Sequence, residues 1–519
     1  MKLSVGIIAA QPEWELLLRQ IGVGFHSLNG ADDPRAAEIP VWIAGAGTAP
    51  DTHESLRRFL EQGGALLLEA ETARRLLGIP IRTISVGYFY GINDPSFGNL
   101  PVSDLNRRCR IGASSAHLQS QAGQGLIERR EVGKGLAIIL PSGLIGALQD
   151  RRVRRKNFPS PFGERLPSER VAAVSAEGIR RVVSRALALL FHARGLPFLQ
   201  LWPFPDGAQG LFGFRIDTDF GNEAEVRALQ QLCERFEIPA TWFLETRSPG
   251  DWFRLYGEMP GQEIAYHCYR HRVLSDAAAS REDFRQGLAR LAGIGVCPQG
   301  YAAPYGEWHP ELNRVLEENG FVYSSEFSLG CDNLPFYPFL EERFSKVLQL
   351  PVHPISVGRL HWARHSEAGM VAYYLRVMEE KLQANEPVFF YHHPGQRRLE
   401  VFEHVFREVR RRNLAVRSLG DYARWWHQLS DFTWEGWSGS NRRVTLKAAL
   451  PDRSIRLQAH WPDGTVRLYP LQNGTVTPED GESRAAARYP APYEPRRLRR
   501  YTAQMLMHDI TWHYGRSKQ

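Results

Sequence analysis

Two histidines four residues apart, His267 and His271, are the side chains in this 519-residue sequence that most directly suggest chemistry. On one helical turn, residues at this spacing place their Cβ atoms about 6 Å apart, so we expect both imidazole rings to reach one metal ion. A carboxylate from elsewhere would complete three protein ligands and leave a position for water, as in hydrolytic zinc sites. Such a pair alone is more often a surface or core feature, so the prediction depends on other motifs.

Two aspartates can supply the carboxylate. Residues 212–246 read as a strand, a turn, a helix and a second strand, which is the length of a βαβ unit. In the first strand apolar residues alternate with Arg215 and Asp217, so these two side chains share a face. Asp219 follows at the strand's C-terminal end, where α/β barrels place their catalytic groups. The alternative is that both aspartates only cap a loop.

Two further motifs follow in order along the chain. The first is YAAPYG at Tyr301–Gly306 and the second is YHHP at Tyr391–Pro394. Each motif alone is weak evidence, and His-His-Pro can be a simple strand end. The order and spacing of all four motifs favour a hydrolytic metal site.

The four motifs together resemble those of the polysaccharide deacetylase family (NodB homology, carbohydrate esterase family 4), over residues 205–425. The resemblance implies a distorted (β/α) barrel and a metal-dependent hydrolase. It assigns Asp217 as the catalytic base. It assigns a divalent metal, Zn²⁺ first with Co²⁺ or Ni²⁺ as alternatives, to three ligands: Asp219, His267 and His271.

The same resemblance assigns two further roles. The backbone N–H of Tyr305 would bind the oxyanion, and His393 would be the general acid, with His392 as its rival. The chain departs from the family at Ala302, where the family has an arginine that orients the base. We hypothesise that Arg215 replaces it; the alternative is an ion pair without a catalytic part. Glu326 lies in the region where an acidic residue supports the acid histidine in the family.

Repeated strand and helix units position these motifs. Strands are expected at Ala240–Leu244, Glu263–Tyr266 and Val388–His392, with amphipathic helices between them. This pattern predicts a barrel domain over residues 196–430.

Residues 1–195 predict a separate doubly wound, flavodoxin-like α/β domain. Strands are expected at Leu3–Ala9, Val41–Ala44 and Ala65–Glu69, alternating with helices. The pattern resembles a class I glutamine-amidotransferase-like domain, which would carry a cysteine nucleophile after the third of these strands. Ala70 stands near that position, so a non-catalytic structural or ligand-holding role is expected.

The last part of the chain changes its period. Apolar residues alternate with polar ones after residue 431, with turn signals between the runs, so residues 431–519 predict a small β-rich extension. A terminal helix is expected at Arg497–His513. A long helix is expected at Ser168–Ala193, before the barrel.

Composition limits the function classes. The chain is 43% hydrophobic, enough for sizeable cores. It lacks an apolar run of the roughly 20 residues that a membrane helix needs. The net charge is +7, and its arginine clusters come without a nucleic-acid-binding motif. Five cysteines without a CxxC motif indicate reduced thiols and a cytoplasmic location.

The sequence therefore predicts a metal-dependent hydrolase that removes acetyl groups from an acetylated sugar, in surface polysaccharide metabolism. The expected partner is the acetylated saccharide, with no nucleic acid and no membrane span. Two alternatives stay open: an amide hydrolase acting on a non-sugar, and a catalytically degenerate carbohydrate-binding or assembly protein.

Overall fold

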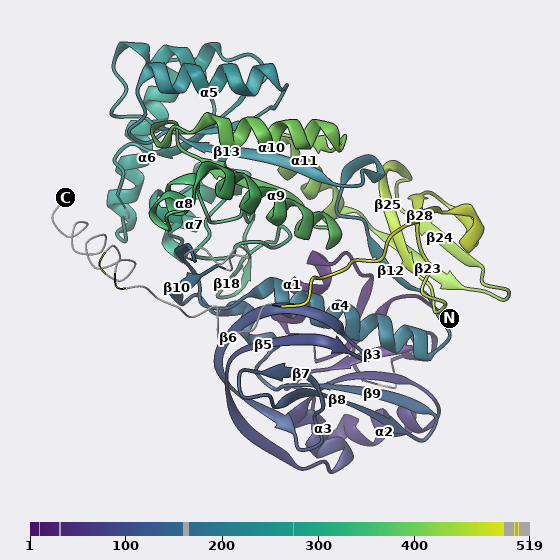
Figure 1. Ribbon diagram of the computed structural model, residues 1–519. Coiled ribbons are helices and arrows are strands. Elements are labelled where there is room, and N and C mark those ends of the chain that lie inside the picture. Colours follow the sequence, from purple (N-terminus) through teal and green to yellow (C-terminus); the bar gives the residue numbers. More distant parts are fainter. Residues whose placement is uncertain are drawn as a thin grey trace. The chain divides into compact units, whose positions relative to one another are not determined.

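The computed structural model describes residues 1–9, 11–30, 33–158, 166–272 and 274–492, together with Ala503 and Met507. The chain groups into two compact units built from separate stretches of sequence (Figure 1). Unit 1 contains Met1–Asp150, Val174–Ala208 and Trp425–Pro492, and unit 2 contains Arg151–Ala173 and Gln209–Arg424. The division into three domains at residues 196 and 431 stays a prediction. Within the described ranges, every helix is too short or too polar to cross a membrane.

Unit 1 is built on a nine-stranded sheet with the order β2-β1-β3-β4-β9-β8-β7-β5-β6. The first five strands pair in parallel. The remaining strands add to this core in antiparallel pairs. The elements of this part are β1 (Val5–Ile8), α1 (Pro12–Gln20), β2 (Phe25–Leu28), β3 (Val41–Ala44), α2 (His53–Glu61), β4 (Ala65–Glu69), α3 (Ala70–Leu77), β5 (Ile81–Asp94), β6 (Gly98–Gly112), β7 (His117–Ser120), β8 (Gly125–Val132), β9 (Gly135–Leu140) and α4 (Ala176–Ala193).

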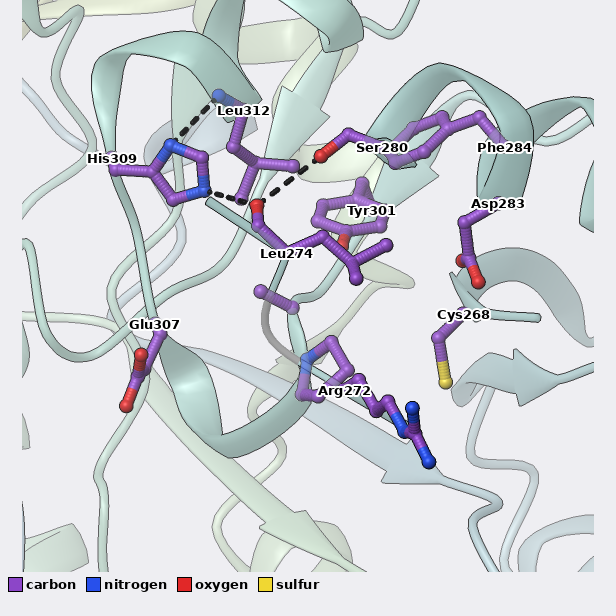
Figure 2. A pocket seen from close by; sticks show the side chains of 12 residues that line it. Cys268, Arg272, Leu274, Ser280, Asp283, Phe284, Tyr301, Glu307, His309 and Leu312 are labelled. Carbon is purple, nitrogen blue, oxygen red and sulfur yellow. Dashed lines mark hydrogen bonds between the residues drawn. The ribbon is translucent and has the colours of Figure 1, made fainter. Parts of the chain in front are cut away.

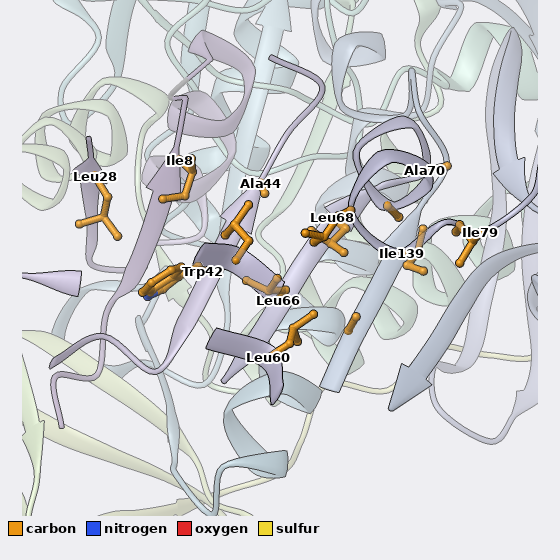
Figure 3. Close-up of a cluster of buried hydrophobic side chains, with 14 of the residues drawn as sticks. Ile8, Leu28, Trp42, Ala44, Leu60, Leu66, Leu68, Ala70, Ile79 and Ile139 are labelled. Carbon is orange, nitrogen blue, oxygen red and sulfur yellow. The ribbon is translucent and has the colours of Figure 1, made fainter. Parts of the chain in front are cut away.

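A cluster of buried apolar side chains joins the parallel strands to the helices beside them (Figure 3). Leu66 and Leu68 of β4 are fully buried in it, as is Leu60 of α2. Trp42 of β3 stacks on Phe59 with 3.7 Å between ring centroids. The helices are held because each presents one apolar stripe to the sheet.

The predicted alternation of strands and helices is confirmed for the parallel part of unit 1. The predicted strand at Leu3–Ala9 is shorter than expected, while those at Val41–Ala44 and Ala65–Glu69 have the expected bounds. The long hairpin of β5 and β6 was not predicted. The flavodoxin-like and amidotransferase-like assignments stay predictions.

The predicted helix at Ser168–Ala193 was wrong in its first part. Residues Ser168–Ala172 form strand β11, which pairs antiparallel with β10 (Val153–Asn157). Helix α4 begins only at Ala176. Apolar spacing did not reveal the strand, because spacing within a segment cannot show that the segment pairs with β10, which lies earlier in the chain.

The C-terminal region is antiparallel, as predicted. One sheet has the order β23-β24-β27 and the other β12-β25-β26-β28. Strand β12 precedes the parallel strands of unit 2 in sequence, and its pairing with β25 was not predicted. The expected helix at Arg497–His513 lies outside the described residues, apart from Ala503 and Met507. These strands are β12 (Phe198–Leu201), β23 (Trp434–Ser438), β24 (Val444–Ala448), β25 (Asp452–His460), β26 (Val466–Leu471), β27 (Gly474–Val476) and β28 (Glu482–Arg484).

Unit 2 is organised around a parallel sheet with the order β20-β17-β16-β15-β14-β13-β21, to which β22 adds beside β13. The two end strands β20 and β21 are not paired with each other in this order, although His353 N, just after β20, donates to Phe389 O of β21 at 2.9 Å. The result is a curled parallel sheet. Its strands are β13 (Leu211–Asp217), β14 (Thr241–Glu245), β15 (Glu263–Cys268), β16 (Gly300–Tyr301), β17 (Tyr323–Ser324), β20 (Leu348–Gln349), β21 (Val388–His392) and β22 (Ala415–Val416).

Helices separate most of these strands along the chain, and a short hairpin of β18 (Phe339–Leu340) and β19 (Arg343–Phe344) precedes β20. The helices are α5 (Glu223–Arg235), α6 (Ala277–Ala292), α7 (Pro310–Glu318), α8 (Val357–Trp362), α9 (Glu367–Gln383), α10 (Leu399–Arg411) and α11 (Leu419–Asp431).

Candidate metal centre

Strand β13 presents its polar residues to the inside of the curled sheet. Phe214, on its opposite face, packs against Phe402 and Phe406 of α10, with ring centroids 4.7 and 5.0 Å away. Arg215 and Asp217 therefore project to the other face, as the alternation predicted. Asp219 follows at the strand's C-terminal end.

The three predicted metal ligands converge. Asp219 lies 3.6 Å from His267 Nε2 through Oδ1 and 3.5 Å from His271 Nε2 through Oδ2. One ligand atom from each of these three residues lies within 4.8 Å of the other two. A carboxylate and two imidazoles at these separations can share one divalent cation and leave a position open for water.

The hydrogen bonds of His267 prepare it to be a ligand. Its Nδ1 lies 2.6 Å from the carbonyl oxygen of Ala302, so Nδ1 carries the hydrogen and Nε2 has a lone pair. Within the described ranges, His267 Nε2 and Asp219 Oδ1 are buried without a hydrogen-bond partner. Buried polar atoms are normally paired, so these two atoms fit a cation between them.

His271 does not lie on a helix, which corrects the predicted geometry. His267 is in β15, and His271 lies in the bend that follows it. Asp283 of α6 accepts hydrogen bonds from the backbone N–H groups of Tyr269 and Arg270, both at 3.0 Å. This loop, rather than a helical turn, brings the second ring back beside the first, with 5.2 Å between centroids.

The electrostatic environment keeps His271 neutral. Burial, followed by the charge of His267, lowers the pKa of His271 to about 4. A neutral ring retains the lone pair that a metal needs. The rings of Tyr305 and Phe220 flank it, with centroids at 4.7 and 5.3 Å.

Arg215 and Asp217 form a bidentate ion pair. Arg215 Nε donates to Asp217 Oδ1 and Nη2 donates to Oδ2, both at 2.7 Å. Arg215 is fully buried, its guanidinium lies over the rings of Phe243 and Tyr391, and Nη1 donates to the backbone oxygen of Ser325. Burial alone would raise the pKa of Asp217, but Arg215 outweighs it and holds the pKa at about 2. The carboxylate is thus ionised and oriented, and a catalytic part for Arg215 stays a hypothesis.

Glu326 lies behind the YAAPYG motif and does not support an acid histidine. It is fully buried, and its Oε1 accepts a hydrogen bond from Ala303 N at 3.1 Å. Burial raises the pKa of Glu326 to about 7. The predicted support of His393 by Glu326 was therefore wrong, because the carboxylate is used to hold the backbone beside Ala302.

Tyr305 lies in a tight turn of left-handed backbone. Its φ is 61° and that of Gly306 is 62°. A Cβ at position 306 would lie 2.5 Å from the Phe327 ring, so the turn requires glycine there on two grounds. Left-handed backbone in a tyrosine is uncommon and is a feature of functional sites.

The two histidines at the end of β21, His392 within the strand and His393 just after it, face opposite ways. His393 Nε2 lies 3.7 Å from Asp219 Oδ1, on the side of the metal ligands. His392 is fully buried on the other face, with its ring centroid 4.8 Å from that of Phe402. Sequence reasoning missed one residue here: Gln396, whose Nε2 lies 2.9 Å from His393 Nδ1. No sequence motif marks it.

A small cavity lies beside β15 (Figure 2). It has a volume of about 20 Å³, enough for about one water molecule and too small for a sugar ring. Cys268 and Asp283 line one part of it, and His309 and Ser280 both hydrogen-bond to the carbonyl of Leu274 nearby (Figure 2).

Comparisons with known proteins support a deacetylase resemblance over part of the chain. No protein-family model matches. A peptidoglycan deacetylase from Helicobacter pylori is 28% identical over 137 residues, which are 25% of this chain and 45% of that protein. The chain thus spans less than half the length of this curated relative.

Two solved structures show similar arrangements. A protein assigned as a polysaccharide deacetylase in Mycobacterium smegmatis has a TM-score of 0.39 and 19% identity, covering 43% of this chain and 92% of its own. A carbohydrate esterase family 4 pseudoenzyme from Bacillus anthracis has a TM-score of 0.30 and 14% identity, covering 42% of this chain and 68% of its own. At these scores neither likeness carries an argument about activity.

Proposed function

We propose that this protein is a metal-dependent hydrolase that removes acetyl groups from an acetylated saccharide. The observation that carries the proposal is the convergence of Asp219, His267 and His271, with one ligand atom of each within 4.8 Å of the others. The sequence similarity to a peptidoglycan deacetylase supports an acetylated glycan as the substrate class. The pairing of Arg215 with Asp217 supports an intact rather than a degenerate catalytic centre.

The donor set fits a divalent cation. One carboxylate and two imidazole nitrogens suit Zn²⁺, with Co²⁺ or Ni²⁺ as alternatives. When bound, such an ion would polarise a carbonyl group and a water molecule.

The protein's own side chains would then handle the protons. Asp217, kept ionised by Arg215, takes a proton from the attacking water, and the backbone N–H of Tyr305 donates to the oxyanion. His393 presents Nε2–H to the leaving nitrogen as a hydrogen-bond donor. The carbon–nitrogen bond breaks to give acetic acid, which ionises to acetate, and an amine, and Asp217 passes the proton that it took from water to the leaving nitrogen.

Metal binding is the first test. Purified protein is expected to hold roughly one divalent ion per chain, measured by elemental analysis, because three ligands define one site. Asp219→Asn should lose the ion, whereas Asp51→Asn, which changes an exposed aspartate of unit 1, should retain it. Wild-type protein that binds no zinc, cobalt or nickel would end the hydrolase proposal and leave a binding or assembly role.

Acetate release is the second test. Wild type and Asp217→Asn are compared on acetylated oligosaccharides, nucleotide sugars and a non-sugar amide, with metal content measured in parallel. We expect acetate from a saccharide with wild type only, at equal metal content. Turnover of the non-sugar amide alone would favour the other hydrolase function. Nucleotide sugars belong in the panel because a cytoplasmic location, which stays part of the proposal, would make precursors the accessible substrates.

A further inference from the structure

The orientation of the Gln396 amide is set by a backbone donor. Gly358 N, in the first turn of α8, donates to Gln396 Oε1 at 2.9 Å. A backbone N–H can only donate, so Oε1 must point at Gly358 and the amino group must point the other way. The atom on that other side is His393 Nδ1, 2.9 Å from Gln396 Nε2.

This geometry assigns the hydrogen of the neutral His393 ring. Gln396 Nε2 donates, so His393 Nδ1 has to accept and carries no hydrogen. The ring hydrogen is then on Nε2, the nitrogen that lies 3.7 Å from Asp219 Oδ1. A carboxylate at position 396 would accept instead and would place the hydrogen on Nδ1.

The loop that carries Gln396 is strained and is held by two consecutive arginine side chains that follow Gln396. Arg397 has φ 54° and ψ −146°, a region that side chains rarely adopt, and Arg398 has φ 57°. Arg397 Nε pairs with Glu225 Oε1 at 2.9 Å, and Arg398 Nη2 lies 3.0 Å from His361 Nδ1. Such strain persists only where the surroundings over-determine it, and the loop next to His393 meets that condition.

The N-terminal turn of α8 leaves room for the amide. A Cβ on Gly358 would lie 2.8 Å from Gln396 Nε2 and 2.9 Å from its Cδ. A real Cβ does not approach so closely, so any other residue at position 358 would displace the amide. Glycine at this position and the glutamine at 396 are therefore complementary.

We propose that Gln396 is a positioning residue that fixes the neutral ring of His393 as its Nε2–H tautomer. The ring then offers the substrate a hydrogen-bond donor rather than a lone pair. This proposal rests on the proposed function for its purpose, but the tautomer itself is a property of the folded protein that needs no turnover.

The tautomer is measured directly by solid-state NMR of full-length protein labelled with ¹³C,¹⁵N-histidine. His393 signals are identified by their loss in His393→Gln. We expect one neutral species with hydrogen on Nε2. A neutral ring with its hydrogen on Nδ1 would overturn the proposal whatever the activity.

Three variants test the cause. Gln396→Leu removes the amide, and Gly358→Ala displaces it while favouring helix α8, so at least one of them should fold. Both should lose the single tautomer and lower kcat roughly 10- to 100-fold with KM and metal content unchanged. Gln396→Glu should move the hydrogen to Nδ1. An unchanged tautomer in Gln396→Leu or in Gly358→Ala would show that another contact fixes the ring.

The outcomes separate this proposal from the proposed function. If the tautomer behaves as stated and no acetate is released from any saccharide, the positioning role stands and the deacetylase function fails. If acetate is released and the tautomer does not respond to Gln396, the positioning role fails alone.

Discussion

Replacing Arg215 by methionine should destabilise unit 2. It should also reverse the direction in which the contribution of Asp217 to folding stability changes with pH. The arginine is fully buried and makes two 2.7 Å hydrogen bonds to that carboxylate. Methionine fills a similar volume without donors. The variant therefore leaves a buried carboxylate with no cationic partner, which is the costly way to break an ion pair.

The magnitude follows from the pKa. In the wild type the pKa of Asp217 is about 2, below its ordinary value of 3.8. A pKa lowered by this much contributes about 2 kcal/mol of folding stability. This stability is present when the pH is above the ordinary pKa and is lost as the pH falls toward 2. In the variant, burial without a partner raises the pKa above ordinary, which destabilises the neutral-pH fold further. We expect a total loss of about 3–5 kcal/mol at neutral pH.

The sign of the pH effect is the sharper part of this prediction. A carboxylate with a raised pKa in the folded protein contributes stability below its ordinary pKa and loses it as pH rises through the folded value. The stability difference between wild type and Arg215→Met should therefore narrow as pH falls from 8 to about 5. In the double variant with Asp217→Asn, part of the loss should be recovered at neutral pH.

The assay uses cysteines of the chain as separate reporters. Cys233 and Cys268 are buried in unit 2, and Cys109 is buried in unit 1. Thiol labelling in a urea series, read by peptide mass spectrometry, should show midpoints for the two unit 2 cysteines lowered by about 1–2 M. The labelling midpoint of Cys109 is the internal control and should be the same in the variant as in the wild type.

Two results would refute the reasoning. A shift that corresponds to less than about 1 kcal/mol would mean that the ion pair is not the buried, desolvated contact described here. A difference that widens on acidification would mean that Asp217 is not left with a raised pKa. Turnover should fall in Arg215→Met with metal content intact, and unchanged kinetics would return Arg215 to a structural role.

Two further changes test the surroundings of the site. Phe220 is 70% exposed, has φ 59° and flanks His271. Phe220→Gly should keep or raise the melting temperature, because it relieves about 1 kcal/mol of backbone strain, and it should raise KM for a glycan several-fold. An unchanged KM would exclude Phe220 from substrate binding. His392 packs against Phe402, so His392→Phe should retain activity. His393→Gln should instead lower kcat roughly 100-fold. The reverse result would exchange the roles of the two histidines.

Local periodicity was sufficient to predict the inner face of β13, and strand order was sufficient to predict that Asp219 and His267 lie near one edge of the sheet. Alternation along a strand assigns Arg215 and Asp217 to one face without knowledge of the rest of the fold. The ends of neighbouring parallel strands share an edge, so Asp219 and His267 had to lie close together once β13 and β15 were both placed in one sheet.

The errors in the sequence predictions concern contacts between distant residues. Four-residue spacing indicates a helix, but the hydrogen bonds from Tyr269 and Arg270 to Asp283 hold His271 in a bend. The partner of His393 is chosen by a backbone N–H of α8, which no side-chain motif encodes. Glu326 was placed by its chain position, whereas its hydrogen bond goes to Ala303.

The pairing of β12 with β25 has a consequence for how this chain is made. Phe198–Leu201 precedes Gln209–Arg424, yet its partner strand ends at His460. During synthesis, β12 emerges early but can pair with β25 only after the whole intervening stretch has been made. Unit 1 therefore contains a strand pair of high contact order that forms late. A protein truncated near residue 430 would leave β12 without its partner strand and therefore prone to aggregation, even though all strands of the curled parallel sheet are present.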